Sequence, residues 1–182
     1  MKTIRLLRSW ISAVALATAS LSSFAGTALK VGDAAPWFVG TNQDGQKWAL
    51  ADHIGKGVVL LYFYPRDGTA ACAAEACSLR DNMAEFKQAG VDVVGVSFDD
   101  KASHQDFIFK YNLDFPLISD TNGFISDAYG ARMAKDQKMD RRVTFLIGLD
   151  GKIIHITDSP DPSLHLKEMA EAMAKLTAKV TH

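Results

Sequence analysis

The stretch at residues 57–72 reads GVVLLYFYPRDGTAAC. Its first eight residues, 57–64, form a continuous apolar run, which is typical of a central strand covered on both faces. Pro65 ends the strand, because proline cannot donate a backbone hydrogen bond to a neighbouring strand. A helix is expected over 70–88, with Gly90 closing it. The stretch therefore predicts a strand that feeds directly into the N-terminus of a helix.

The segments on either side of this unit alternate between expected strands and helices. We expect an N-terminal hairpin with its second arm at 46–50, strands at 91–98 and 115–118, a helix that Ser103 caps and that ends near Tyr111, a short helix at 123–129, a β-hairpin from 142–147 and 152–156, and an amphipathic C-terminal helix. This order predicts an α/β protein with a mixed central sheet, helices on both faces and an N-terminal hairpin. The thioredoxin-like fold is the natural candidate.

The first 25 residues have a different character from the rest of the chain. A positively charged start precedes an apolar, Ala- and Ser-rich run at 10–21, and small residues follow it. This pattern predicts a signal peptide over 1–25, cleaved after Ala25 or Ala28, with one domain at 29–182. The apolar run is short for a membrane span, so we expect an exported, periplasmic protein without stable membrane association after cleavage. An uncleaved anchor is the alternative, and it would also export the domain.

Composition and charge give no sign of a heavily charged partner. The 182 residues are 48% hydrophobic and 23% charged, with a formal net charge of −1. These proportions are ordinary for a globular domain. No basic patch or acidic run stands out, so nothing in the charge points to a nucleic acid.

The chain has two cysteines, Cys72 and Cys77. In an exported protein a cysteine pair usually forms a disulfide, but a staple across so short a loop contributes little stability, which favours redox chemistry. Cys72 is expected near a helix N-terminus, where free N–H groups and the helix dipole stabilise a thiolate, the nucleophilic form. Thr69 places a hydroxyl beside it, and Pro65 stiffens the loop and shields the pocket.

The spacing Pro65-x-x-x-Thr69-x-x-Cys72 resembles the active-site motif of peroxiredoxins. The residues 62–81, together with Gly95-Val96-Ser97, Ser103-His104-Gln105-Asp106-Phe107 and 115–120, resemble the bacterioferritin comigratory protein, or peroxiredoxin Q, subfamily of the alkyl hydroperoxide reductase and thiol-specific antioxidant superfamily. The resemblance covers essentially the whole predicted domain. One departure is that Ala70-Ala71 stands where the subfamily usually has Pro-Gly, so the helix can start without the usual proline.

The resemblance implies a thiol-dependent peroxidase without cofactor or metal. Cys72 would be the peroxidatic cysteine, oxidised to a sulfenic acid by hydrogen peroxide or an organic hydroperoxide. Cys77 would resolve the sulfenic acid as an intramolecular disulfide, and a thioredoxin-like donor would reduce that disulfide. The resemblance also implies a monomer.

Arg142 matches the arginine that holds the thiolate and polarises the peroxide in this family. Arg141 is the competing assignment. Strand alternation puts the two on opposite faces, so only one can reach the site, and the spacing to Phe145 favours Arg142. Glu75 either polarises the site or is an ordinary acid in the first turn of a helix. His104 is interpreted as structural.

Other functions explain less of the sequence. An exported thioredoxin-fold copper chaperone would use the cysteine pair and a distant histidine such as His155, but it would not need Pro65 and Thr69. A thiol-disulfide oxidoreductase would space its cysteines C-x-x-C. A structural disulfide in an inert domain leaves the motif around Cys72 unexplained.

Overall fold

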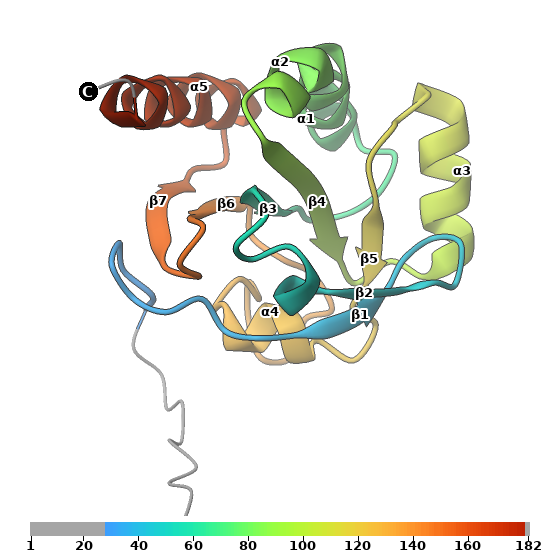
Figure 1. The fold of residues 1–182 in the computed structure, drawn as a ribbon. Coiled ribbons are helices and arrows are strands. Elements are labelled where there is room, and N and C mark those ends of the chain that lie inside the picture. Colours follow the sequence, from blue (N-terminus) through green and yellow to red (C-terminus); the bar gives the residue numbers. More distant parts are fainter. Residues whose placement is uncertain (1–27, 181–182) are drawn as a thin grey trace, which may run out of the picture.

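The structure is a computed structural model that describes residues 28–180, with side chains described as far as Lys175 (Figure 1). The signal peptide predicted at 1–25 lies outside the described residues and stays a prediction. The elements are β1 (Val39–Thr41), β2 (Lys47–Ala49), a 3₁₀ turn η1 (Leu50–Asp52), β3 (Val58–Phe63), α1 (Ala70–Asp81), α2 (Met83–Gln88), β4 (Val91–Ser97), α3 (Lys101–Tyr111), β5 (Leu117–Ser119), α4 (Phe124–Ala128), β6 (Val143–Ile147), β7 (Ile153–Asp158) and α5 (Pro162–Val180).

Five strands form one mixed sheet in the order β5-β4-β3-β6-β7. β3, β4 and β5 are parallel, β6 is antiparallel to β3, and β7 is antiparallel to β6. β1 and β2 form a separate antiparallel hairpin. The expected α/β architecture, with its mixed sheet and N-terminal hairpin, is confirmed. β3 lies in the centre of the sheet and runs into α1, as the apolar run at 57–64 predicts.

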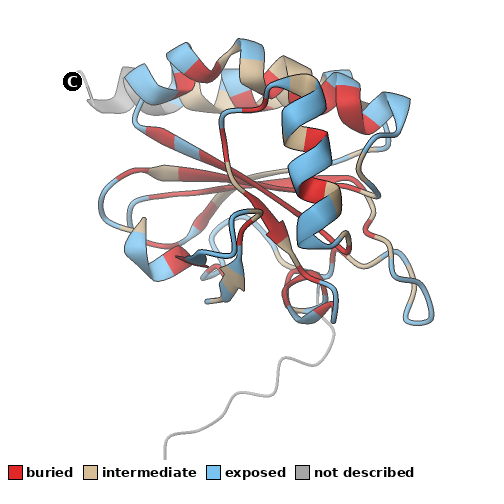
Figure 2. Ribbon diagram, turned by 90° about the vertical axis from the view of Figure 1, so that its right-hand side faces the viewer, coloured by how far each residue is buried: buried red, intermediate tan, exposed pale blue. Residues whose placement is uncertain are grey.

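Side chains that alternate along β3 divide the core into two layers. Figure 2 shows that most of the sheet is coloured as buried, with other elements above and below it. Leu60 and Tyr62 face the layer formed with α1, α2, α3 and α5. Leu61 and Phe63 face the opposite layer, which contains α4 and the N-terminal hairpin. The sheet is therefore covered on both sides, which explains why its central strands are apolar without a polar face.

Two expected elements have different bounds in the structure. The helix expected over 70–88 is two helices, because Asn82 interrupts it with a non-helical backbone and donates from its side chain to the carbonyl of Ser78 at 2.8 Å. Such a side-chain bond competes with the helical backbone pattern. The strand expected at 115–118 begins at Leu117, because Pro116 has no N–H and contributes only its carbonyl, which accepts from Gly95.

The start of α3 also differs from the expectation. Asp100, not Ser103, caps the helix, and its carboxylate accepts a hydrogen bond from the Ser103 backbone at 2.9 Å. Ser103 lies inside the first turn, so its hydroxyl is free to make another contact. Among residues 28–180, no helix is both long and apolar enough to cross a bilayer.

Candidate active site

The loop between β3 and α1 delivers Cys72 to the first turn of α1. Thr69 has an extended backbone and caps this helix, and its hydroxyl oxygen accepts from the Cys72 N–H at 3.4 Å. The helix starts at Ala70, so the cap forms directly before the Ala70-Ala71 pair. The Cys72 side chain lies within the core and is 2% exposed. Pro65, which follows β3, is half-buried.

Arg142, which lies just before β6, reaches the sulfur of Cys72 on α1. Its Nη2 lies 3.4 Å from Sγ, although the two residues are 70 positions apart in the chain. Arg142 directly precedes β6, and strand alternation puts it on the same face as Thr144. Arg141 points elsewhere, donating from Nε to the Gly130 carbonyl and pairing with Asp158. The structure thus brings Arg142, and not Arg141, to Cys72.

Glu75 lies one turn after Cys72 on α1 and forms an ion pair with Arg142 Nη1. Its side chain is 3% exposed, and burial raises the pKa of Glu75 to about 7, although Arg142 opposes this effect. Burial by itself would lower the pKa of Arg142, but Glu75 and Cys72 raise it above its usual value. Arg142 therefore stays positively charged between a carboxyl group and a sulfur.

His165 and Thr144 extend this cluster, and the sequence reasoning missed both. His165, near the start of α5, has its Nε2 2.8 Å from the Ser159 carbonyl, so Nε2 carries the proton. Its Nδ1 accepts from the Thr144 hydroxyl at 2.7 Å. Burial lowers the pKa of His165, and Arg142 lowers it further, so the imidazole is neutral. The 3.8 Å separation of His165 Nδ1 and Glu75 Oε1 is therefore not an ion pair. Strand alternation from Arg142 to Thr144 was the signal that could have located part of this cluster.

Cys77 lies on the same helix as Cys72, and both are free thiols. Five positions along an α-helix correspond to a rise of about 7.5 Å and a rotation of about 140° between the side chains. A disulfide needs Cα atoms within about 7 Å and side chains that face each other. The two sulfurs cannot bond while α1 is intact.

Comparison with known proteins identifies the family. The model of the AhpC/TSA family matches residues 31–156. The chain belongs to this family. A peroxiredoxin Bcp of Escherichia coli K12 is 42% identical over 142 residues, which are 75% of this chain and 90% of the relative. A chloroplastic peroxiredoxin Q of Triticum aestivum is 35% identical over 176 residues, or 93% of this chain and 81% of the relative.

Solved structures of AhpC/TSA relatives have the same fold. The peroxidoxin BcpB of Mycobacterium tuberculosis superposes with a TM-score of 0.75 at 31% identity, covering 82% of this chain and 97% of that one. A peroxiredoxin Q of Xanthomonas campestris gives a TM-score of 0.69 at 27% identity, covering 76% and 90%. The thioredoxin-like fold is confirmed, and the chain is a peroxiredoxin, that is, a thiol-dependent peroxidase.

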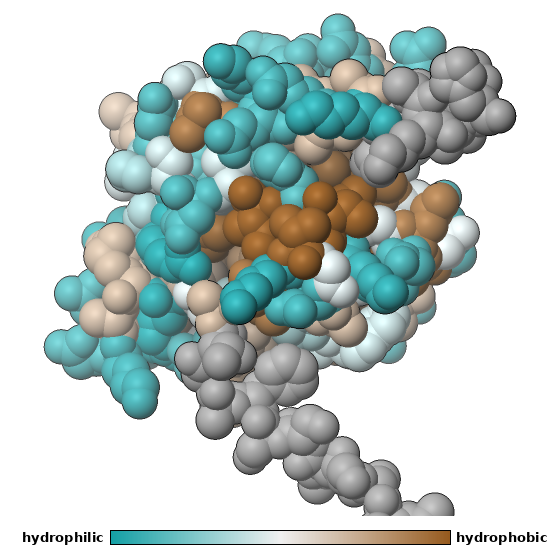
Figure 3. All heavy atoms as spheres, turned by 90° about the vertical axis from the view of Figure 1, so that its left-hand side faces the viewer, coloured by the Kyte–Doolittle hydropathy of each residue, from teal (hydrophilic) through white to brown (hydrophobic). Residues whose placement is uncertain are grey.

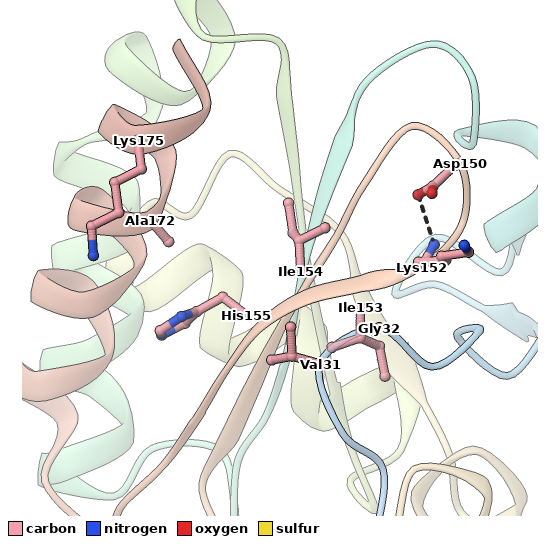
Figure 4. A pocket seen from close by; sticks show the side chains of 9 residues that line it. All are labelled: Val31, Gly32, Asp150, Lys152, Ile153, Ile154, His155, Ala172 and Lys175. Atoms are coloured by element: carbon pink, nitrogen blue, oxygen red, sulfur yellow. Dashed lines mark hydrogen bonds between the residues drawn. The ribbon is translucent and has the colours of Figure 1, made fainter. Parts of the chain in front are cut away.

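A hollow of about 480 Å³ lies between β7 and α5, and Cys72 is not among the residues that line it. Figure 4 shows Ile154 and His155 on one side of it and Lys175 on the other. Apolar side chains gather on this face of the molecule (Figure 3). His155 lies 3.4 Å from Glu168, and within residues 28–180 no group of three or more His, Cys, Asp and Glu side chains could hold a metal ion. The copper-chaperone interpretation gains no support.

Proposed function

We propose that Cys72 is the peroxidatic cysteine and that it reduces hydrogen peroxide and organic hydroperoxides. The main support for this proposal is the position of Cys72 in the first turn of α1, where its sulfur lies 3.4 Å from Arg142 Nη2. The thiolate attacks one peroxide oxygen, the O–O bond breaks, and the other oxygen leaves as water or an alcohol after taking a proton. Cys72 becomes a sulfenic acid. Arg142 and the N-terminal N–H groups of α1 stabilise the negative charge of the thiolate and the charge that develops on the leaving oxygen.

Cys77 then resolves the sulfenic acid. Its thiol attacks the Cys72 sulfur, water leaves and an intramolecular disulfide forms. Because the intact helix keeps the two side chains about 140° apart, the segment from about Thr69 to Ser78 must unwind first. Alanine is the strongest helix former, and Ala70, Ala71, Ala73, Ala74 and Ala76 all lie in this segment. Disulfide formation is therefore expected to limit turnover at high peroxide, which exposes Cys72 to further oxidation to a sulfinic acid.

A thioredoxin-like dithiol is the proposed donor that returns both cysteines to thiols. The exchange transfers the disulfide to the donor through a mixed disulfide. The signal pattern at 1–25 supports export to the periplasm, so this donor must itself be exported or relayed across the membrane. We propose that the enzyme acts as a monomer.

The test is peroxide consumption by the mature chain with thioredoxin or dithiothreitol as donor. The unmodified protein should consume hydrogen peroxide, Cys72→Ser should not, and Cys77→Ser should oxidise once without forming the intramolecular disulfide. Far-UV circular dichroism should show loss of helix between the dithiol and disulfide forms. Peroxide consumption by Cys72→Ser at the unmodified rate, or equal helix content in the two forms, would contradict the proposal.

A further inference from the structure

The active-site loop, 65–69, is hydrogen-bonded to distant segments of the protein through one residue, Asp67. Arg66, Gly68 and Thr69 are exposed, whereas the Asp67 side chain is 6% exposed. Within the described part of the chain, Asp67 makes every hydrogen bond that joins this loop to a segment beyond the adjoining β3 and α1. The position of the loop therefore depends on what holds Asp67.

Asp67 is held by residues at the end of β3 and the start of α3. Its Oδ1 accepts from the Tyr64 hydroxyl at 2.8 Å, and its Oδ2 accepts from the Ser103 hydroxyl at 2.8 Å. Oδ2 also lies 2.8 Å from His104 Nδ1, and the Asp67 N–H donates to Asp99 Oδ2 at 2.9 Å. The N-terminus of α3 adds a favourable field for the carboxylate.

His104 is fully enclosed, and its contacts point to the loop. A carboxylate only accepts hydrogen bonds, so His104 Nδ1 donates to Asp67. The other ring nitrogen is buried without a hydrogen-bond partner among residues 28–180. Tyr64, at 3.4 Å, is the remaining polar neighbour of Nδ1. Burying the imidazole ring with one nitrogen unpaired costs free energy. The short hydrogen bond to Asp67 is the main polar contact that offsets this cost.

A short segment of chain and one hydrogen bond connect Asp67 to the backbone of Cys72. Gly68 has φ +71°, a left-handed conformation that glycine adopts readily, and it turns the chain outward to Thr69. Thr69 then caps α1 through the Cys72 N–H. A shift of Asp67 would move this cap, and the same turn must open before the disulfide can form.

We propose that Asp67 and His104 are positioning residues for Cys72, which fix the loop in the form that caps α1 and thereby set the balance between peroxide attack and disulfide formation. The inference rests on the proposed roles of Cys72 and Cys77. With the pair intact, the first turn of α1 is held closed for attack. With the pair broken, the turn opens more readily, so attack slows while resolution does not.

The experiment measures the two chemical steps separately in Asp67→Ala, Asp67→Asn and His104→Phe. Rapid mixing of each reduced protein with hydrogen peroxide gives the rates of Cys72 oxidation and of disulfide formation, and mass spectrometry gives the sulfinic-acid fraction. Asp67→Ala and His104→Phe should oxidise about 10- to 100-fold more slowly, the scale for a small displacement of a reacting group. Their disulfide step should be as fast as in the unmodified protein or faster, and their sulfinic-acid fraction lower. Asp67→Asn, which keeps the shape and an acceptor, should recover most of the oxidation rate.

A second His–Asp pair supplies the matched control. His53 Nδ1 lies 2.9 Å from Asp92 Oδ2, and this pair is not among the hydrogen bonds of residues 65–69. His53→Phe should leave both steps unchanged. If Asp67→Ala does not fold, His104→Phe carries the test, because phenylalanine keeps the ring volume. Oxidation of His104→Phe at the unmodified rate, or an equal slowing of both steps, would overturn the inference. Failure of the unmodified protein to oxidise would instead count against the proposed function.

Discussion

Two buried carboxyl groups, one in each layer of the core, share a raised pKa but differ in their neighbours. Burial raises the pKa of Glu75, beside α5, to about 7, and Arg142 partly offsets the effect. Burial also raises the pKa of Asp140 to about 7, where a hydrogen bond from Ser126 of α4 lowers it and the charge of Asp120 raises it. Both side chains lie almost entirely out of contact with solvent.

The neighbours decide what each carboxyl group can do. Glu75 binds a cation that also contacts the Cys72 sulfur. Asp140 shares the Ser126 hydroxyl with Asp120, at 3.0 and 2.8 Å, and that hydroxyl has one proton to donate. The second oxygen of Asp140 has no partner among the described residues. A raised pKa therefore marks burial, and only the presence of a cation and a nucleophile makes the group part of an active site.

The largest expected effect comes from removing the cation. Arg142→Ala should lower the rate constant for peroxide reduction by about 100- to 1,000-fold, or roughly 3–4 kcal/mol, because one charged donor to the transition state is lost. Arg141→Ala should stay close to the unmodified rate, since its guanidinium contacts Gly130 and Asp158. Stopped-flow measurement of Cys72 oxidation checks both variants. A damaging Arg141→Ala with a harmless Arg142→Ala would show that the strand register is wrong.

A smaller effect is expected on the free energy of unfolding when Asp140 is replaced by asparagine. In the unfolded chain this carboxyl ionises near its usual value of 3.8, but in the folded protein only near 7. The protonated Asp140 side chain therefore contributes its full stabilisation below about pH 4. This stabilisation is lost as the pH rises to about 7 and stays lost above that. The free energy of unfolding falls by roughly 4 kcal/mol at most between the two ends of this range. Asp140→Asn should therefore raise the free energy of unfolding at pH 8 by about 2 kcal/mol and leave it little changed at pH 4.

Urea unfolding at pH 4 and pH 8 measures this difference. Asp136→Asn is the matched control, because Asp136 is exposed in the same loop and should shift stability at neither pH. A decrease in the stability of Asp140→Asn at pH 8 would show that the ionised carboxylate is well accommodated.

The smallest expected effect is on the rate of peroxide reduction, which should depend on Glu75 but not on Asp140. Glu75→Ala should slow peroxide reduction about tenfold, or roughly 1.4 kcal/mol, because Arg142 loses the partner that orients it. Glu75→Gln keeps an acceptor for Arg142 and should stay within about threefold of the unmodified rate. Asp140→Asn should not change the rate. The same stopped-flow assay ranks the three variants, and a slow Asp140→Asn would remove the distinction between the two groups.

Local rules make the central part of the fold predictable. The apolar run at 57–64, the break at Pro65 and a threonine three residues before Cys72 all act within a few positions of one another. Strand alternation likewise separates Arg141 from Arg142, because neighbouring residues of a strand point to opposite faces. These features depend on backbone periodicity and capping, which neighbouring residues determine.

The same local rules fail where a side chain has more than one possible partner. Asn82 could stay in a helix or bond to Ser78, and the second outcome divides the helix expected over 70–88. Ser103 is a plausible helix cap, but Asp100 takes that position, and Ser103 donates to Asp67 instead. Sequence spacing does not distinguish these outcomes, because each choice satisfies a local rule.

Backbone periodicity and capping were enough to predict the strand that leads into a capped helix and the cysteine in its first turn, and they placed Arg141 and Arg142 on opposite faces. The tertiary structure alone decided which distant side chains meet there. Glu75 meets Arg142 across 67 positions, His165 meets Thr144 across 21, and Asp67 meets His104 across 37. Capping and periodicity are short-range effects. These contacts instead exist because β6, α3 and α5 pack against the helix that carries Cys72 or against the loop before it. Buried polar groups then pair with whichever partners this packing brings close.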